Sequence, residues 1–464
     1  MVLFEKAKNI LRKLEVNRAV FYSVLTTGWS AFAGLLTILV IAYWLSADEQ
    51  GFYYTFSSVL ALQVFVELGL TTVIIQVTSH EWAFLTHDEN GKIRGDERAL
   101  SRLASLLRFS LKWYFVCGIV VIFLLSSCGY IFFLTRPHPE IEWQIPWLAL
   151  CFVAGLTLML SPFLLIIEGS NQIASIYSFR FVQGIWTSLA LIAGMLLGFG
   201  LYSLALSALV RFISSCVFII WRHYNFIFQL LNFKIKERIN WNTEVWPFQW
   251  KIAISWLSGY FIFSIFMPIM FYYHGPQVAG QMGMTWAITW MIVSFSSSWI
   301  GTRMPQLGIL IANRQYEELD RLFSRLFLIT VVISIFCSLI FWLLIYGLHI
   351  FNMEIKDRLL PILPITLLLI DRIILVMIAD MALYLRAHKK EPMMIPSLIG
   401  ALLAGTSTWL LGAAYGPMGA ISGLLALDIL WGMPSCYFVF STCRKKWHVE
   451  EYSPKVFSYK RIIS

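Results

Sequence analysis

Long apolar runs separated by shorter polar segments dominate the chain. A helix needs about 20 mostly apolar residues to cross the hydrocarbon of a bilayer. It also satisfies its own backbone hydrogen bonds, so it is the element expected inside lipid. The pattern predicts an all-α polytopic membrane protein with about twelve transmembrane helices, at residues 19–45, 52–78, 110–134, 145–168, 174–199, 202–224, 247–273, 277–302, 322–347, 358–385, 393–415 and 417–441.

The links between these spans alternate in length and charge. Of the 35 Lys and Arg residues, 28 lie at the chain ends or in the even-numbered links and the span ends beside them, three lie in or next to the odd-numbered links, and four lie deeper within spans. Lys and Arg are enriched in cytoplasmic loops, so we expect both termini in the cytoplasm. The sequence predicts a cytoplasmic amphipathic N-terminus at 1–18, a six-helix bundle at 19–224, a cytoplasmic linker at 225–246, a second six-helix bundle at 247–441 and a cytoplasmic tail at 442–464.

Composition agrees with a membrane protein. Hydrophobic residues make up 59% of the chain and charged residues only 13%, about half of the roughly 25% that is usual in soluble domains. The net charge is +9, and the basic residues that produce it lie between apolar spans. This position favours contact with anionic membrane lipids over binding of nucleic acid. The seven Cys residues form no CxxC or Cys/His cluster, so we expect no metal site, disulfide framework or cofactor.

Two pairs of glycine-bearing turns indicate an internal repeat. The turns around Gly51 and Gly280 lie about half the chain apart, as do those around Gly200 and Gly419. The two turns of each pair fall on the same side of the membrane, so the halves would be parallel repeats of six helices. The alternative is that short turns between helices require glycine in any case.

Three segments resemble one family of transporters. LSADEQGFYYTFSSVLALQVFVELGL, IIEGSNQIASIYSFR and YLRAHKKEPMMIPSLIGALL are similar to turns of Wzx-type polysaccharide flippases. These flippases belong to the MATE-like multidrug/oligosaccharidyl-lipid/polysaccharide exporter superfamily. The motifs are short, and the resemblance covers most of the chain in topology.

The resemblance implies two six-helix bundles around a central cavity that opens alternately to each side. It implies a flippase in the bacterial inner membrane that moves an undecaprenyl-diphosphate-linked oligosaccharide, such as an O-antigen repeat unit for lipopolysaccharide, to the periplasmic leaflet. A polysaccharide polymerase is a possible partner of such a flippase.

Charged residues inside the spans are the candidate site. Each costs about 2.5–3.5 kcal/mol at a helix centre on insertion scales, so such residues usually face a bundle interior or a water-filled path. Arg211 and Arg372 lie near mid-membrane, and Arg180 lies nearer the cytoplasmic end of its span. Guanidinium matches phosphate oxygens with two parallel hydrogen bonds. We therefore predict that Arg211, Arg372 and Arg180 bind the diphosphate of the substrate.

Acidic residues in the spans have two interpretations. Glu67, Asp371 and Asp428 lie deep, and Asp380 lies closer to the cytoplasmic face. One of these carboxylates could take up H⁺ or Na⁺ and couple transport to an ion gradient, or it could neutralise an Arg as a structural ion pair. Since adjacent helical residues point about 100° apart, we expect no pairing between Asp371 and Arg372.

Deep tryptophans also have two interpretations. Trp186, Trp256, Trp286, Trp290 and Trp409 fall inside spans. Their rings could stack on sugars, but packing in the helix bundle is the more common role of such residues.

Two other functions remain open. A proton- or sodium-coupled multidrug exporter of the same superfamily often carries an acid in the first or seventh helix, and neither 19–45 nor 247–273 contains Asp or Glu. A membrane glycan polymerase or ligase usually has a large periplasmic loop, and no HExxH, GxSxG or Walker A motif is present. We therefore expect no enzyme and no catalytic residues. A lipid II flippase would usually have two further helices.

Overall fold

The computed structural model describes residues 18–87, 92–136, 138–388 and 392–450. These residues are mostly helical, and their only strands form the antiparallel hairpin of β1 (Leu85–His87) and β2 (Ile93–Gly95), in which Leu85 pairs with Gly95. The predicted N-terminal segment and most of the predicted tail lie outside the described residues. The contacts divide the chain into two compact units, Met1–Met284 (unit 1) and Thr285–Ser464 (unit 2).

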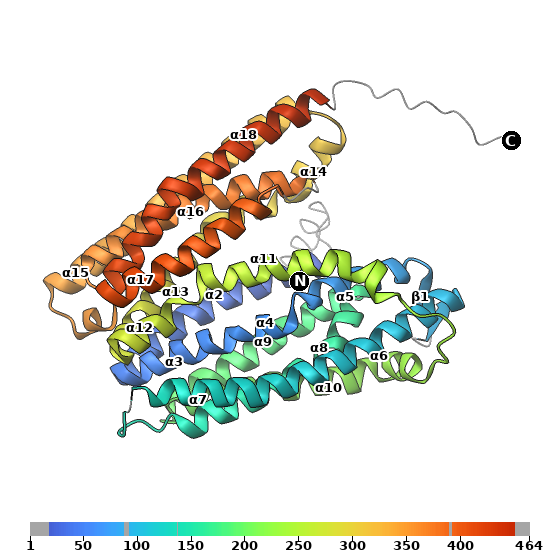
Figure 1. The fold of residues 1–464 in the computed structure, drawn as a ribbon, viewed down its shortest axis with the longest axis horizontal. Helices are drawn as coiled ribbons and strands as arrows, with labels where there is room; N and C mark the ends of the chain where they lie inside the picture. Colours follow the sequence, from blue (N-terminus) through green and yellow to red (C-terminus); the bar gives the residue numbers. More distant parts are fainter. Residues whose placement is uncertain (1–17, 88–91, 137, 389–391, 451–464) are drawn as a thin grey trace, which may run out of the picture. The chain divides into compact units, whose positions relative to one another are not determined.

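Unit 1 is a helix bundle in which α8 (Gln144–Gly169) packs against α5, α6, α7, α9 and α10. The long helices of this unit run side by side (Figure 1). Its other elements are α2 (Arg18–Trp44), α3 (Ala47–Leu60), η1 (Ala61–Gln63), α4 (Val64–Glu67), α5 (Leu70–Trp82), α6 (Glu97–Val120), η2 (Val121–Leu125), α7 (Ser126–Leu134), α9 (Ile173–Leu196), α10 (Tyr202–Asn232), η3 (Trp241–Val245), α11 (Trp246–Phe263), α12 (Phe266–His274) and the first residues of α13 (Pro276–Thr302).

Unit 2 is built around α16 (Ile362–Ala387), which packs against α14, α15, α17 and α18. Its other elements are the rest of α13, α14 (Met304–Ala312), α15 (Tyr316–Ile350), η4 (Glu354–Arg358), α17 (Met394–Leu427), η5 (Asp428–Gly432) and α18 (Met433–Glu450). Because α16 has neighbours on several sides, polar residues along it are removed from solvent.

Helices lie at each of the twelve predicted spans, with differences in how they join. Within the described residues, nine helical segments are long and apolar enough to cross a membrane, and one bent pair makes ten. The last two predicted spans form a single run, Met394–His448, with a kink at Gly416, whose φ is 62°. The helix α13 is not among the ten, because Gln, Gly, Ser and Thr interrupt its apolar residues.

The second predicted span, 52–78, is broken rather than continuous. Leu68 and Gly69 both adopt left-handed backbone angles, with φ of 50° and 66°. The two parts of the span meet at a bend of 48°. Gly69 also lies against α11, where an added Cβ would be 2.5 Å from Ile252 Cγ2. The apolar run therefore predicted the span, but the sequence pattern missed the break.

The turns around Gly51 and Gly280, which sequence analysis paired as candidate repeats, lie against one another in unit 1. The Gln50 Nε2 atom donates a hydrogen bond to the Gly280 carbonyl at 2.9 Å. A Cβ on Gly51 would fall 2.0 Å from the Pro276 carbonyl oxygen. This close approach explains the glycine at 51. The division into two six-helix repeats stays a prediction, and α11 and α12 pack against α3, α4 and α5 within unit 1.

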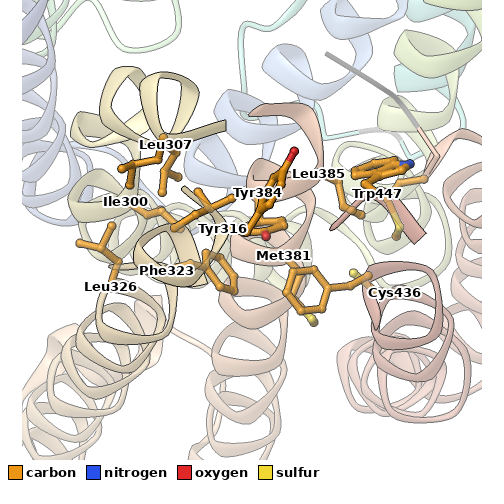
Figure 2. Close-up of a cluster of buried hydrophobic side chains, with 14 residues drawn as sticks. Ile300, Leu307, Tyr316, Phe323, Leu326, Met381, Tyr384, Leu385, Cys436 and Trp447 are labelled. Atoms are coloured by element: carbon orange, nitrogen blue, oxygen red, sulfur yellow. The ribbon is translucent and has the colours of Figure 1, made fainter. Parts of the chain in front are cut away.

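Two hydrophobic cores stabilise the units. In unit 1, the fully buried rings of Phe52, Phe56, Phe133, Trp147 and Phe271 pack together. Unit 2 has a core near one end of its helices, part of which Figure 2 shows. Its members include Ile300, Leu307, Tyr316, Leu319, Phe323, Leu326, Met381, Tyr384, Leu385, Cys436, Phe440 and Trp447.

A polar network crosses the edge of the unit 2 core. Tyr384 Oη donates to Asp320 Oδ1 at 3.0 Å. Arg444 Nε donates to the other carboxylate oxygen of Asp320, also at 3.0 Å. This network joins α15, α16 and α18, so it fixes the ends of three helices around the core.

Candidate functional site

The side chain of Arg211 is exposed on α10 of unit 1. Its backbone carbonyl accepts hydrogen bonds from Gln183 Nε2 at 3.0 Å and from the hydroxyls of Ser214 and Ser215. Among the residues that the structure describes, no acceptor or carboxylate binds its guanidinium group. A guanidinium without an internal counter-charge is free to bind an anionic ligand.

A row of polar side chains joins α9 and α10 beside Arg211. Gln183 Nε2 also donates to the hydroxyls of Ser214 and Ser215, at 2.9 and 3.0 Å. One turn further along α9, the backbone carbonyl of Thr187 accepts a hydrogen bond from the Ser207 hydroxyl at 3.0 Å. The contact between α9 and α10 beside Arg211 is therefore partly polar.

Arg180 is paired within unit 1. Its two terminal nitrogens donate to both carboxylate oxygens of Glu168, at 3.2 and 2.6 Å, and its guanidinium lies 5.5 Å from the centre of the Tyr177 ring. A cavity of about 680 Å³ is lined by Glu168, Tyr177, Ser170 and neighbouring residues. Because Glu168 already occupies two donors of Arg180, a diphosphate would have to compete with this carboxylate.

Arg372 lies in a different environment, in the interior of unit 2. It is only 1% exposed, and its neighbour Asp371 is completely buried. The Arg372 guanidinium carbon lies 4.0 Å from the ring centre of Trp286 and 5.6 Å from that of Trp290. A cation over a tryptophan ring is attracted by the negative electrostatic potential above the ring face, most strongly where water is excluded. At this degree of burial, water has little access to the guanidinium.

The expectation that Asp371 and Arg372 do not pair is wrong. Arg372 Nε lies 3.8 Å from Asp371 Oδ2, which is within ion-pair range but too long for a hydrogen bond. The long Arg372 side chain thus approaches Asp371 while its guanidinium lies over the tryptophans of α13. Neither Asp371 oxygen, nor Arg372 Nε or Nη2, has a hydrogen-bond partner among the described residues.

Asp428 is the second acid of this buried cluster. It begins η5, a π-helical turn between α17 and α18, and its carboxyl group interacts with Asp371 and Arg372. π-Helical turns inside helices are frequent at functional sites. The cluster thus holds two carboxylates and one guanidinium, which is one negative charge more than it can neutralise by itself.

Glu67 and Asp380 lie in two other places. Glu67 ends α4 at the break of the second span, where its carboxylate accepts from the Thr71 hydroxyl at 3.1 Å, and Thr71 in turn contacts Tyr114 Oη at 3.1 Å. Asp380 is fully buried on α16 and accepts from the Thr330 hydroxyl. Neither acid has an Arg or Lys partner in the described residues.

Sequence reasoning missed the role of Trp286 and Trp290 as partners of Arg372. Their spacing of four residues places both rings on one face of α13, and this was the available signal. Within the described residues, no group of three or more His, Cys, Asp or Glu could hold a metal ion. None of the seven Cys residues, all of which lie in the described part of the chain, forms a disulfide.

Comparison with known proteins identifies the fold. No family model matches the chain, and neither does any curated protein sequence. Among solved structures, the chain is similar to the lipid II flippase MurJ in an inward closed conformation, with a TM-score of 0.64, 14% identity, and coverage of 93% of this chain and 91% of that chain.

Two multidrug transporters have the same fold. The MATE multidrug transporter DinF-BH in a ligand complex matches with a TM-score of 0.61 and 12% identity, over 91% of this chain and 95% of that chain. An inward-facing MATE transporter of the MOP superfamily matches with a TM-score of 0.58 and 13% identity, over 92% and 96%. The chain is therefore an all-helical, multi-pass membrane protein with the MATE/MurJ fold.

Proposed function

We propose that this protein is a flippase that translocates an undecaprenyl-diphosphate-linked oligosaccharide across the bacterial inner membrane by alternating access. The observation that carries the proposal is Arg211, an exposed guanidinium within a membrane-spanning helix that no residue of the described chain neutralises. A diphosphate offers the charge and the paired oxygens that a guanidinium binds best.

The energetic cost of this position supports a ligand role. An Arg near the centre of a span costs about 2.5–3.5 kcal/mol on insertion scales, and such residues usually mark substrate paths. Arg180 reduces its cost by pairing with Glu168, and Arg372 by its contacts with Trp286 and Asp371. Arg211 has no such compensation, which favours an anion that arrives with the substrate.

The buried cluster of unit 2 suits a separate role in the proposed cycle. Two carboxylates beside one guanidinium favour uptake of one H⁺ or Na⁺, because like charges at short range resist full ionisation. We propose Asp371 and Asp428 as the ion-coupling pair, with Glu67 and Asp380 as further candidates. Arg372 would hold this pair in place, and it would reach a diphosphate only in a conformation that opens the cluster.

A transport assay with matched variants tests the role of Arg211. Wild-type protein, Arg211→Ala and Arg211→Lys are reconstituted in vesicles with a fluorescent undecaprenyl-diphosphate-linked oligosaccharide, and its movement between leaflets is measured. Arg222→Ala is the control, since Arg222 is also an exposed Arg of α10. We expect loss of transport in Arg211→Ala, reduced transport in Arg211→Lys and normal transport in Arg222→Ala. Normal transport by Arg211→Ala would reject the proposal.

The multidrug exporter is the second candidate, because two proteins of that class share the fold. Glu67 at the break of the second span supplies a carboxylate that an ion-coupled exporter could use. The same vesicles, loaded with a cationic dye under a proton or sodium gradient, separate the two functions. Dye efflux that depends on Glu67 and not on Arg211 would favour the exporter. The polymerase or ligase alternative gains no support from the fold.

A polysaccharide polymerase stays a proposed partner. An O-antigen polymerase would consume the translocated repeat unit at the periplasmic surface. Cells that lack the flippase should accumulate the lipid-linked unit on the cytoplasmic side.

A further inference from the structure

A small basic pocket lies between the middle of α6 and the segment that follows α10. It has a volume of about 290 Å³ and is lined by Ser105, Leu106, Arg108, Phe109, Lys112, Ile235, Arg238, Ile239 and Trp241. Three of these nine residues are cationic and none is acidic. The pocket lies within unit 1, and Arg211 is not among the residues that line it.

The acids near this pocket are already paired with other cations. Glu237 binds Arg98 at 2.6 Å, and Glu244 binds Arg102 at 2.5 Å. Arg102 also binds Glu81 at 2.8 Å. These pairs join the segment after α10 to the first turns of α6, which leaves Lys112 and Arg238 without a carboxylate partner among the described residues.

The walls of the pocket are held in place by local contacts. Arg108 Nη2 donates to the carbonyls of Leu231 and Phe233, at 2.7 and 2.6 Å. The rings of Phe109 and Trp241 stack with their centres 4.0 Å apart, and the Ile239 amide donates to Ser105 Oγ at 3.2 Å. These contacts hold Arg108 and the aromatic wall of the pocket in place, and the exposed side chains of Lys112 and Arg238 are available to a ligand.

The position of the pocket indicates the kind of anion. The predicted span of α6 begins at residue 110, so Arg108, Phe109 and Lys112 lie where the helix enters the membrane. Aromatic and basic side chains at this depth are characteristic of the headgroup region, and basic pockets beside transmembrane helices bind anionic lipid headgroups. A volume of about 290 Å³ is at the small end of ligand sites, which suits a headgroup better than a drug-sized molecule.

We propose that this pocket binds the phosphate of an anionic phospholipid in the cytoplasmic leaflet. Lys112 and Arg238 bind the phosphate oxygens, and the Phe109–Trp241 pair packs on the glycerol and first acyl carbons. The side of the membrane follows from the positive charge of the even-numbered links. The site is independent of the proposed transport of a lipid-linked glycan, and its test does not require transport.

The test is binding of phosphatidylglycerol to the delipidated full-length protein in a zwitterionic detergent, followed by native mass spectrometry. The pocket variant is K112Q/R238Q. The control K234Q/K445Q removes the same total charge from exposed lysines that do not line the pocket. Each Lys or Arg near an anionic surface contributes about 1 kcal/mol, so we expect the pocket variant to bind about thirty-fold more weakly.

Three results would overturn the proposal or its ligand. Equal binding by wild type, pocket variant and control overturns the site. Equal binding of phosphatidylcholine overturns the role of the anionic headgroup. Binding of glycerol 3-phosphate that equals binding of phosphatidylglycerol at the same concentration overturns the lipid as the source of the phosphate. If the double variant is not recovered, the single variants K112Q and R238Q should each bind about fivefold more weakly.

Discussion

Arg211 of unit 1 and Arg372 of unit 2 have the same chemistry in opposite environments. Arg211 is exposed and its guanidinium has no partner among the described residues, whereas Arg372 is 1% exposed beside Trp286 and Asp371. A mid-span Arg therefore need not be a ligand site, because the protein can neutralise the charge internally. From this difference we propose that Arg211 binds the external anion and that Arg372 has an internal, charge-balancing role.

The largest predicted effect is on stability when Arg372 is removed. Arg372→Ala leaves the buried Asp371 without its cation, and breaking a buried pair in this way costs about 3–5 kcal/mol. Arg211→Ala should change stability by less than about 0.5 kcal/mol, as expected for an exposed residue without partners. Unfolding in mixed detergent micelles measures both. Similar losses in the two variants would remove the distinction.

The second prediction separates the two tryptophans that face Arg372. Trp286 lies 4.0 Å from the guanidinium and Trp290 lies 5.6 Å from it. Replacing each Trp with Leu keeps an apolar side chain and removes the aromatic ring, whose negative face attracts the guanidinium. We expect Trp286→Leu to cost about 2 kcal/mol of cation–π attraction and Trp290→Leu clearly less. The same unfolding measurement decides it, and an equal or reversed order would show that the ring contact does not stabilise Arg372.

The third prediction concerns the geometry of the hydrogen-bond donors at position 211. Arg211→Lys keeps one positive charge but loses the paired donors that fit a diphosphate. Loss of one bidentate contact of about 1.4 kcal/mol corresponds to about tenfold weaker substrate binding. The concentration dependence of transport measures this change. Wild-type affinity in Arg211→Lys would indicate that only the charge matters, which is expected for a less specific anion or a drug.

The smallest predicted effect is the pH dependence of the link between α6 and the segment after α10. The hydrogen bond from Arg102 lowers the pKa of the Glu244 carboxyl below its ordinary value near 4.5. A lowered folded-state pKa means that the stabilisation is complete above the unfolded pKa and is lost as the pH falls through the folded value.

Because Glu244 is partly exposed, we expect this contribution to be below about 1 kcal/mol. The difference in stability between wild type and Glu244→Gln should be largest near pH 7 and disappear as the pH falls below 4. A difference that grows on acidification would contradict the assignment to this ion pair.

Sequence patterns predicted the helical class and the positions of the spans. The fold class is confirmed by the MATE/MurJ structures. The glycine-bearing turn around Gly200 is also present, with φ of 82° at Gly198 and 50° at Gly200. The bundle boundaries, the coupling acids and the orientation of the termini stay predictions.

The sequence by itself determined which segments enter the bilayer, because transfer into lipid depends on the residues of one segment, whose contributions add up locally. Only the tertiary structure decided the partner of each charge. The Arg372 guanidinium contacts Trp286 on another helix, the Arg180 guanidinium binds Glu168 across a turn, and the Arg211 guanidinium has no counter-charge among the described residues. These outcomes depend on which helix faces pack together, and the apolar content of a span does not specify its facing neighbour.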